Sequence, residues 1–399
     1  GVALAAPEGV DWAMLRSPAV TLAVIILLAA GAAWLPAQVA DNDPPPPGDL
    51  PGFWRSTLED VDTEVGAVRR GSVETIAVSP GGRPVYAVRY GEQDELHSQA
   101  NYNSAVAAKN PAWYARKDAT TRPVVLFLGP VHGQEVEGIV GLVNLIHVAE
   151  TGADHRGRPW PELKRRLEQF RVLVVPSANP DGRARCPYDS FVGVPTRTMT
   201  KYGQGTRRDG SLYGWPGAKA VHPMVGDVGI LGAYFNDDGV NPMHDDFFLP
   251  MASETEAILR LAREEAPDIA VSLHSHESPP MVLQASYVPV FMKERIRDLS
   301  VRVKERYGEV DLPYGDVREP QTEDETPGPT RYLNLTSALH HVSGAMAFTF
   351  ECSHGSVGER AAPLTHDQIL DVQLLLYDEM LRYVLENRLY WGRPKRGGE

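Results

Sequence analysis

Short, continuously apolar segments constrain the fold of this chain more than any other feature of its sequence. PVVLFL (123–128), RVLVV (171–175), DIAVSL (268–273) and AMAFTF (345–350) are apolar at almost every position instead of at alternate positions. This pattern predicts strands buried on both faces of a sheet. Helical segments separate them, so we expect an α/β fold. Its architecture should be a three-layer sandwich with a mixed, largely parallel central sheet flanked by helices.

Further elements complete this expectation. Residues 73–78 and 85–90 flank Pro80–Gly82, which predicts a hairpin. Helices are predicted at 135–150, 253–265 and 364–389, the second of them starting with a capping box formed by Ser253 and Glu256. The Gly- and Pro-rich region 183–235 is too long for a plain connection, and we expect it to cover a functional site.

An apolar segment near the N-terminus indicates export. Residues 19–33 carry no charge, Arg16 precedes them, and read from Met14 the segment has the layout of a signal peptide. An uncleaved membrane anchor is the main alternative, and a buried core helix is the other. We therefore expect a protein that is secreted, periplasmic or anchored facing outside the cytoplasm. The expected parts are a signal peptide or anchor at 1–40 (of which 1–13 need not be native), a proline-rich linker at 41–52, one catalytic domain at 53–392 and a tail at 393–399.

Charge and cysteine content exclude some functions. Thirty-nine Lys and Arg residues stand against 52 Asp and Glu residues, a net charge of −13. This balance argues against nucleic acid as a partner, since binding to a phosphate backbone needs a basic face. Two cysteines are too few for a disulfide scaffold or a Cys₄ zinc module.

Reactive side chains follow the predicted buried strands, at the edge where α/β proteins collect their chemistry. They are His132 and Glu135, the segment Asn179–Gly182, His274 and His276, and Glu351.

A hydrolytic zinc site needs three His or Glu ligands and an open position for water. His132, Glu135 and either His274 or His276 supply such a set, and Glu351 is a candidate general base. His-x-x-Glu also occurs at His147, but that residue lies late in a predicted helix and is interpreted as structural.

Five motifs in one order resemble the zinc carboxypeptidases typified by pancreatic carboxypeptidase A. They are His132–Glu135, Asn179–Gly182 (NPDG), Ser253–Glu256 (SETE), Ser272–Ser275 (SLHS) and Phe348–Glu351 (FTFE), and the resemblance spans roughly residues 55–388. It implies one zinc ion per chain held by His132, Glu135 and His274, with Glu351 as the catalytic base. His276 then lines the substrate site.

The sequence departs from the family at the residues that recognise substrate. The family's carbonyl-polarising arginine is closest in spacing to Arg197, with Arg183, Arg185, Arg207 and Arg208 as alternatives. The family's Asn-Arg pair for the substrate carboxylate is missing from its interval, where alignment places either Asp237 or His244. Tyr332 is the candidate for the family's substrate-gating tyrosine.

The resemblance therefore implies a zinc-dependent hydrolase of peptide or amide bonds, carboxypeptidase-like, in which Glu351 assists attack by zinc-bound water. One alternative is an amidase acting on peptidoglycan or modified peptides, and another is a non-catalytic zinc-binding domain. The expected partner is a peptide or cell-wall peptide, with membrane contact only through an uncleaved N-terminal segment.

Two further expectations depend on the resembling fold. Asp237, Asp238, Asp245 and Asp246 would repel a terminal carboxylate if they face the pocket; the alternative is that they cap turns or face solvent. Cys186 and Cys352 both border the site in that fold, so they form either one disulfide or two reduced, buried thiols.

Overall fold

The structure is a computed structural model that describes residues 43–321 and 332–388. The predicted signal or anchor at 1–40 and the tail at 393–399 lie outside these residues. By its internal contacts the chain divides into two units, Gly1–Pro44 and Pro45–Glu399, and the second unit contains the sheet and its helices. No helix among the described residues has the length and apolar character needed to cross a membrane.

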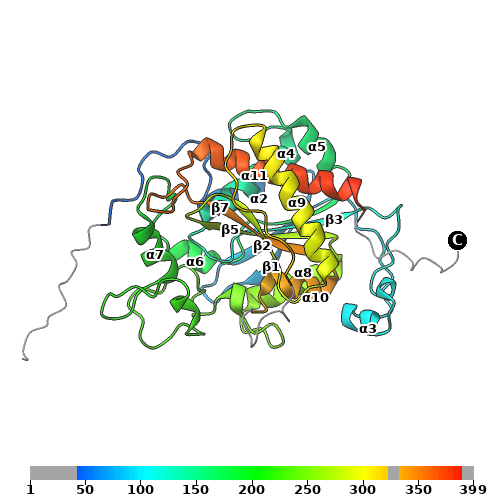
Figure 1. The fold of residues 1–399 in the computed structure, drawn as a ribbon, viewed down its shortest axis with the longest axis horizontal. Coiled ribbons are helices and arrows are strands. Elements are labelled where there is room, and N and C mark those ends of the chain that lie inside the picture. Colours follow the sequence, from blue (N-terminus) through cyan, green and yellow to red (C-terminus); the bar gives the residue numbers. More distant parts are fainter. Residues whose placement is uncertain (1–42, 322–331, 389–399) are drawn as a thin grey trace, which may run out of the picture. The chain divides into compact units, whose positions relative to one another are not determined.

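Seven strands in the described chain form one mixed sheet, in the order β1-β2-β4-β3-β5-β7-β6 (Figure 1). The neighbours β4, β3, β5 and β7 run parallel, whereas β1, β2 and β6 join their neighbours antiparallel. The strands are β1 (Ser72–Val78), β2 (Pro84–Tyr90), β3 (Val124–Leu128), β4 (Arg171–Val175), β5 (Ile269–His276), β6 (Met281–Gln284) and β7 (Met346–Ser353). The predicted fold class is confirmed.

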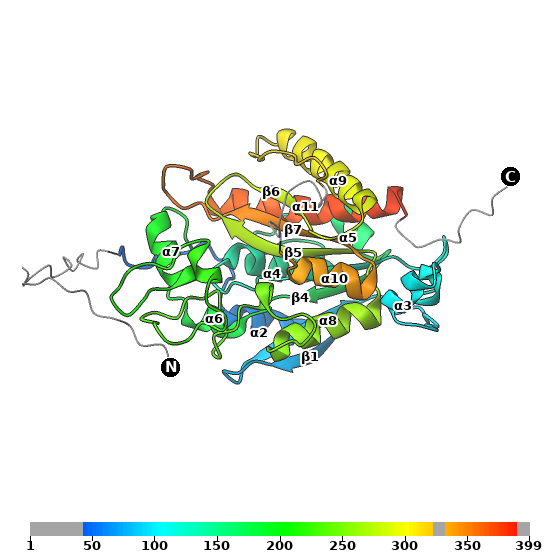
Figure 2. The same cartoon turned by 60° about the horizontal axis from the view of Figure 1, so that its bottom comes forward.

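Helices cover both faces of this sheet because its central strands are apolar on both sides. On β3, Val125 and Phe127 face one core, and Leu126 and Leu128 face the other. The first core is closed by α2 (Leu58–Ala67), α4 (Val136–Thr151), α5 (Pro161–Leu167), α9 (Val290–Gly308) and α11 (His366–Glu386). The second is closed by α8 (Ser253–Glu265) and α10 (Leu335–Ser343). Figure 1 shows α4, α5 and α11 above the sheet and α8 and α10 below it, and Figure 2 shows the arrangement from another side.

The region 183–235 is mostly irregular. It contains the end of α6 (Pro180–Arg185), α7 (Thr196–Gln204) and a short 3₁₀ turn at Gly217–Lys219. The remaining short elements are α3 (Tyr102–Ala107) and the 3₁₀ turns Pro111–Trp113 and Pro242–His244.

The predicted capping box of α8 is wrong. Ala252 is the N-cap of this helix, and no side chain caps it. The Ser253 hydroxyl donates instead to the Val78 carbonyl of β1, at 2.8 Å. The Asp245 carboxylate accepts the backbone N–H of Ala252 from outside the helix, at 3.1 Å. The serine therefore ties the helix to the sheet edge, and a distant aspartate takes the place of a local cap.

Candidate metal centre and active site

Three side chains meet where the neighbouring strands β3 and β5 end. His132 and Glu135 lie in the turn between β3 and α4, and His274 lies near the end of β5. The Nδ1 atom of His132 is 2.8 Å from Glu135 Oε1, and the Nδ1 atom of His274 is 2.9 Å from Glu135 Oε2. All three side chains are buried, so one carboxylate and two imidazole nitrogens converge on one point.

Burial and charge shift the pKa values of this cluster in opposite directions. Burial opposes ionisation of Glu135, but the two imidazoles outweigh it and lower the pKa of the carboxyl to about 2. Burial lowers the pKa of His132. For His274 burial acts the same way, but the adjacent Glu135 carboxylate prevails and its pKa is raised. The carboxyl group therefore stays ionised, as a metal ligand must be.

Outer contacts orient the two imidazoles. His274 Nε2 lies 3.1 Å from the Ser272 hydroxyl, which can accept its N–H and leave Nδ1 free toward Glu135. The ring of Tyr234 stacks on His132 with 3.7 Å between centroids. The donor set of two imidazoles and one carboxylate is the one that hydrolytic zinc sites use. These residues therefore fit a zinc ion.

Glu351 lies beside the cluster because of strand register. It pairs directly with His274 in the parallel ladder of β5 and β7. Both strands are longer than predicted, since the ladder continues to His276 and Ser353, so these residues lie within strands instead of after them. Glu351 is half-buried and faces the cavity described below.

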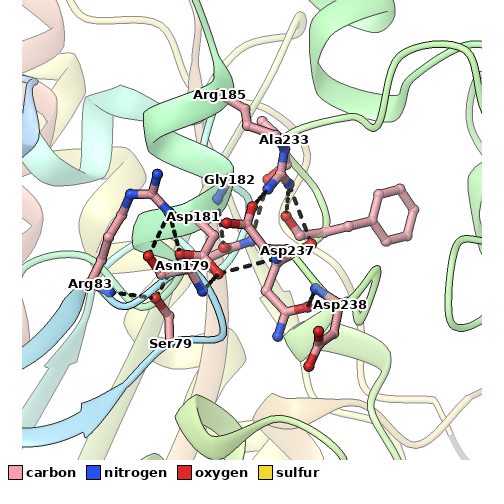
Figure 3. A network of polar contacts seen from close by, with 12 residues as sticks. Ser79, Arg83, Asn179, Asp181, Gly182, Arg185, Ala233, Asp237 and Asp238 are labelled. Atoms are coloured by element: carbon pink, nitrogen blue, oxygen red, sulfur yellow. Dashed lines mark hydrogen bonds and ion pairs between the residues drawn. The ribbon is translucent and has the colours of Figure 1, made fainter.

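The Asn-Pro-Asp-Gly segment holds the ligand turn without entering it. The side-chain amide of Asn179 donates to the Val131 carbonyl at 2.9 Å, next to His132. Asp181 is fully buried and accepts hydrogen bonds from Ser79 at 2.6 Å, from the Gly81 N–H at 3.0 Å and from Arg83 at 2.8 Å (Figure 3). This segment therefore joins the β1–β2 hairpin to the metal cluster.

A cavity of about 1180 Å³ opens over these residues. The metal cluster and Glu351 line it, and so do the predicted substrate residues His244, His276 and Tyr332. The region 183–235 contributes further lining residues, which include Thr196, Gln204, Trp215 and Tyr234.

Lys219 is a cavity residue that the sequence analysis missed. Its Nζ lies over the rings of Trp215 and Tyr332, 4.8 and 4.5 Å from their centroids. Burial lowers its pKa, while the charge of Glu351 opposes that shift. Burial and the Lys219 charge together lower the pKa of His244 to about 2, so His244 is neutral beside a cation. A single lysine in an irregular loop carries no spacing signal that could have identified it.

The predicted arginines lie elsewhere. Arg197 is exposed on α7, and neither it nor its four alternatives lines the cavity. Arg183 donates to the Ser56 carbonyl and Arg185 pairs with Asp237. The structure therefore does not bring Arg197 to the metal cluster.

The four aspartates expected near the pocket do not line it either. Asp237 pairs with Arg83 and Arg185. Asp245 and Asp246 accept backbone N–H groups of their own loop, from Met251 at 3.0 Å and Phe248 at 3.1 Å respectively. Asp245 and Asp246 therefore cap turns of their own loop, and Asp238 is exposed. Cys186 and Cys352 are buried free thiols, so the disulfide alternative is not observed.

Comparison with known proteins agrees with this geometry. Residues 68–214 match the family model described as zinc carboxypeptidase. The structure of a metallo-carboxypeptidase from Burkholderia cenocepacia is 14% identical in sequence. The alignment spans 82% of this chain and 68% of that protein, with a TM-score of 0.51. That likeness shows the fold.

Two further solved structures are more distant. A Pseudomonas aeruginosa metallo-carboxypeptidase, solved with (2-guanidinoethylmercapto)succinic acid, is 14% identical over 84% of this chain and 68% of its own, with a TM-score of 0.43. Bovine thrombin-activatable fibrinolysis inhibitor is 12% identical over 84% of this chain and 99% of the bovine chain, with a TM-score of 0.48. No curated protein matches the sequence.

Proposed function

We propose that this chain, whose residues 68–214 match the zinc carboxypeptidase family model, is a carboxypeptidase-like enzyme and that the cavity is its active site. The match to the family model supports a zinc metallopeptidase, and the fold agrees with it. The proposal concerns which residues act and on what substrate. The observation that carries the proposal is the register of β5 and β7, which sets Glu351 directly beside His274 of the metal cluster.

His132, Glu135 and His274 would hold one zinc ion through the atoms that already face each other. A zinc ion there supplies a Lewis acid that polarises a carbonyl and makes water acidic enough to react near neutral pH. Glu351 accepts the proton of the attacking water on its carboxylate. It then returns that proton to the nitrogen of the departing amine, which completes hydrolysis.

Lys219 replaces the arginine expected to bind the substrate carboxylate. It is a cation of the cavity wall whose charge acts on Glu351, His244 and His274. Tyr332 lies under it, and the ring of neutral His244 meets that tyrosine at 5.0 Å. The aspartates that would have repelled a carboxylate do not line the cavity. We therefore assign Lys219, Tyr332 and His244 to the free C-terminus of a peptide.

Replacement of Glu351 by Gln tests the catalytic assignment. Glu351→Gln should lower kcat by about 10²–10⁴-fold and retain one zinc ion in the catalytic cluster, because the base is not a ligand. His274→Ala should lose that zinc ion. Glu359→Gln is the matched control, since this exposed residue follows on the same segment and does not line the cavity. Loss of zinc from Glu351→Gln together with its retention in His274→Ala would overturn the assignment.

The substrate assignment is tested on one acylated peptide with a free or an amidated C-terminus. The free acid should be preferred in kcat/KM, and Lys219→Met should remove most of that preference. Equal cleavage of both peptides by the unaltered enzyme would instead favour the amidase alternative.

We also propose that the enzyme acts outside the cytoplasm. The uncharged segment 19–33, preceded by Arg16, supports this. Fractionation of cells expressing the chain, with and without residues 1–40, should place only the longer form in the exported or membrane fraction.

A further inference from the structure

A second His₂Glu cluster lies away from the cavity. Glu64 of α2, His147 of α4 and His155 in the loop after α4 bring their donor atoms within 4.8 Å of one another. His147 Nδ1 lies 3.2 Å from Glu64 Oε1, and His155 Nε2 lies 2.9 Å from Glu64 Oε2. The two imidazoles stack with 3.9 Å between centroids. None of the three residues lines the cavity.

This cluster repeats the carboxylate contacts of the catalytic one, although its two imidazoles are stacked whereas those of the catalytic cluster meet edge to face. In both, the two oxygens of one carboxylate each face the nitrogen of a different imidazole, at 2.8 and 2.9 Å in the catalytic cluster. The corresponding distances at Glu64 are 3.2 and 2.9 Å. Within the described chain, these are the two groups of His, Cys, Asp and Glu residues whose donor atoms gather closely enough to hold a metal ion.

Charge and access also suit an ion. Burial opposes ionisation of Glu64, but both histidines favour its charged form, and the net effect lowers the pKa of the carboxyl. Two imidazoles and one carboxylate form a ligand set for zinc. The side chain of His147 is 30% exposed, so an ion and a fourth ligand from solvent can reach the cluster.

We propose that Glu64, His147 and His155 form a second divalent-metal site, for which Zn²⁺ is the ion favoured by this donor set. The site fastens α2, the first helix of the described chain, to the C-terminal half of α4 and the loop that follows it. It takes no part in peptide hydrolysis, because its residues lie outside the cavity.

Metal content and unfolding temperature test this site without reference to activity. Protein equilibrated with Zn²⁺ and then passed through a desalting column should retain two zinc ions per chain. His155→Gln, which keeps a polar group facing Glu64, should retain one. His274→Ala should also retain one zinc ion, and the double variant His155→Gln/His274→Ala should retain none. His97→Ala alters an exposed histidine and should retain two.

The His274→Ala background isolates the second site. Addition of Zn²⁺ to this variant should raise the unfolding temperature by several degrees, since an ion that binds only the folded state stabilises it. His155→Gln should abolish that rise. One zinc ion in the unaltered protein, or a rise that His155→Gln leaves intact, would identify the cluster as an ordinary ion pair and overturn the proposal.

Discussion

Ser272 decides which nitrogen His274 presents to a metal. Its hydroxyl lies 3.1 Å from Nε2, on the far side of the ring from Glu135. Loss of such an outer partner costs about 10–100-fold in metal affinity. We therefore expect Ser272→Ala to weaken catalytic-site zinc binding by about that factor, as measured by competition with a chelator. Ser343→Ala, at a buried serine bonded to the Leu339 carbonyl, should leave the affinity unchanged.

Lys219 should produce a pH dependence that only one substrate reports. Burial lowers the pKa of Lys219, so the amine loses its charge at a lower pH than an ordinary lysine does. For a free-acid peptide, kcat/KM should fall as the pH rises through that value, because a neutral amine no longer attracts the carboxylate.

The amidated peptide is the internal control, since any pH effect on the hydrolytic step itself acts on both substrates. The ratio of the two kcat/KM profiles should therefore isolate Lys219. In Lys219→Arg the ratio should stay constant into alkaline pH, because a guanidinium remains charged. A ratio that falls equally in both enzymes would contradict the assignment.

At the scale of residues, the structure brings together those predicted site residues whose positions the backbone fixes. His132, Glu135, His274 and Glu351 adjoin apolar strands, and parallel register brings such positions together. The structure does not bring Arg197 to the cavity, whereas Lys219 lines it, and both residues belong to the mostly irregular region 183–235. There, sequence spacing does not determine which side chains reach the cavity.

At the scale of elements, two backbone segments pack closely against the ligand turn. A Cβ added to Gly133 would lie 2.0 Å from the backbone nitrogen of Arg183 and 2.2 Å from the carbonyl carbon of Gly182. A Cβ added to Gly182 would in turn lie 2.2 Å from the Ala233 oxygen. The Gly133 N–H also donates to the Ala233 oxygen at 2.7 Å. Both glycines are therefore needed for close approach.

Gly133→Ala should consequently force the ligand turn off the NPDG loop. We expect a loss of roughly 1–3 kcal/mol or more in the free energy of unfolding, measured in urea, together with weaker zinc binding. Gly66→Ala in α2 is the matched control, because its Cβ would meet nothing within 4 Å. That change should be neutral or stabilise by up to about 1 kcal/mol. Equal effects of the two substitutions would refute the close-packing argument.

Predicted elements were most accurate where the pattern was strongest. The strand at 171–175 and the helix at 253–265 have the bounds that were expected. Helix α9 was not predicted, although its buried residues Met292, Ile296, Leu299, Val303 and Tyr307 follow helical spacing. Its many charged residues dilute that signal, and only packing against the sheet shows which face is apolar.

At the scale of the whole molecule, His340 links stability to pH. Burial lowers the pKa of this α10 residue to about 4, although its bond to the Ala345 carbonyl opposes the shift. A histidine in the unfolded chain titrates near pH 6.5. As the pH falls from about 6.5 to about 4, the unfolded state binds a proton that the folded state does not, so stability falls. The contribution is at most about 3 kcal/mol.

We therefore expect the wild-type protein to lose more unfolding free energy than His340→Gln between about pH 7 and pH 4. Both proteins would be unfolded in urea with the same metal content, so that acid release of zinc cancels between them. His97→Gln, at an exposed site, should follow the wild type. If all three curves run parallel, His340 carries no such penalty.

The complete sheet shows which part of the architecture could be predicted. Continuous apolar segments predicted the parallel centre correctly, and the Pro80–Gly82 turn predicted the antiparallel β1–β2 edge. The strand order and the second His₂Glu cluster could not be predicted. Glu64, His147 and His155 are 83 and 8 residues apart in the chain and meet only through the packing of α2 on α4.

The buried carboxylate of Asp181 has a consequence for hydrogen exchange. It accepts the backbone amides of Gly81 at 3.0 Å and of Asp237 at 3.1 Å, two residues far apart in the sequence (Figure 3). Neither amide can exchange its proton with solvent until its hydrogen bond to that carboxylate breaks. Because Asn179 of the same segment holds the ligand turn, the two amides act as paired reporters: an opening that frees them together also loosens the support beneath His132.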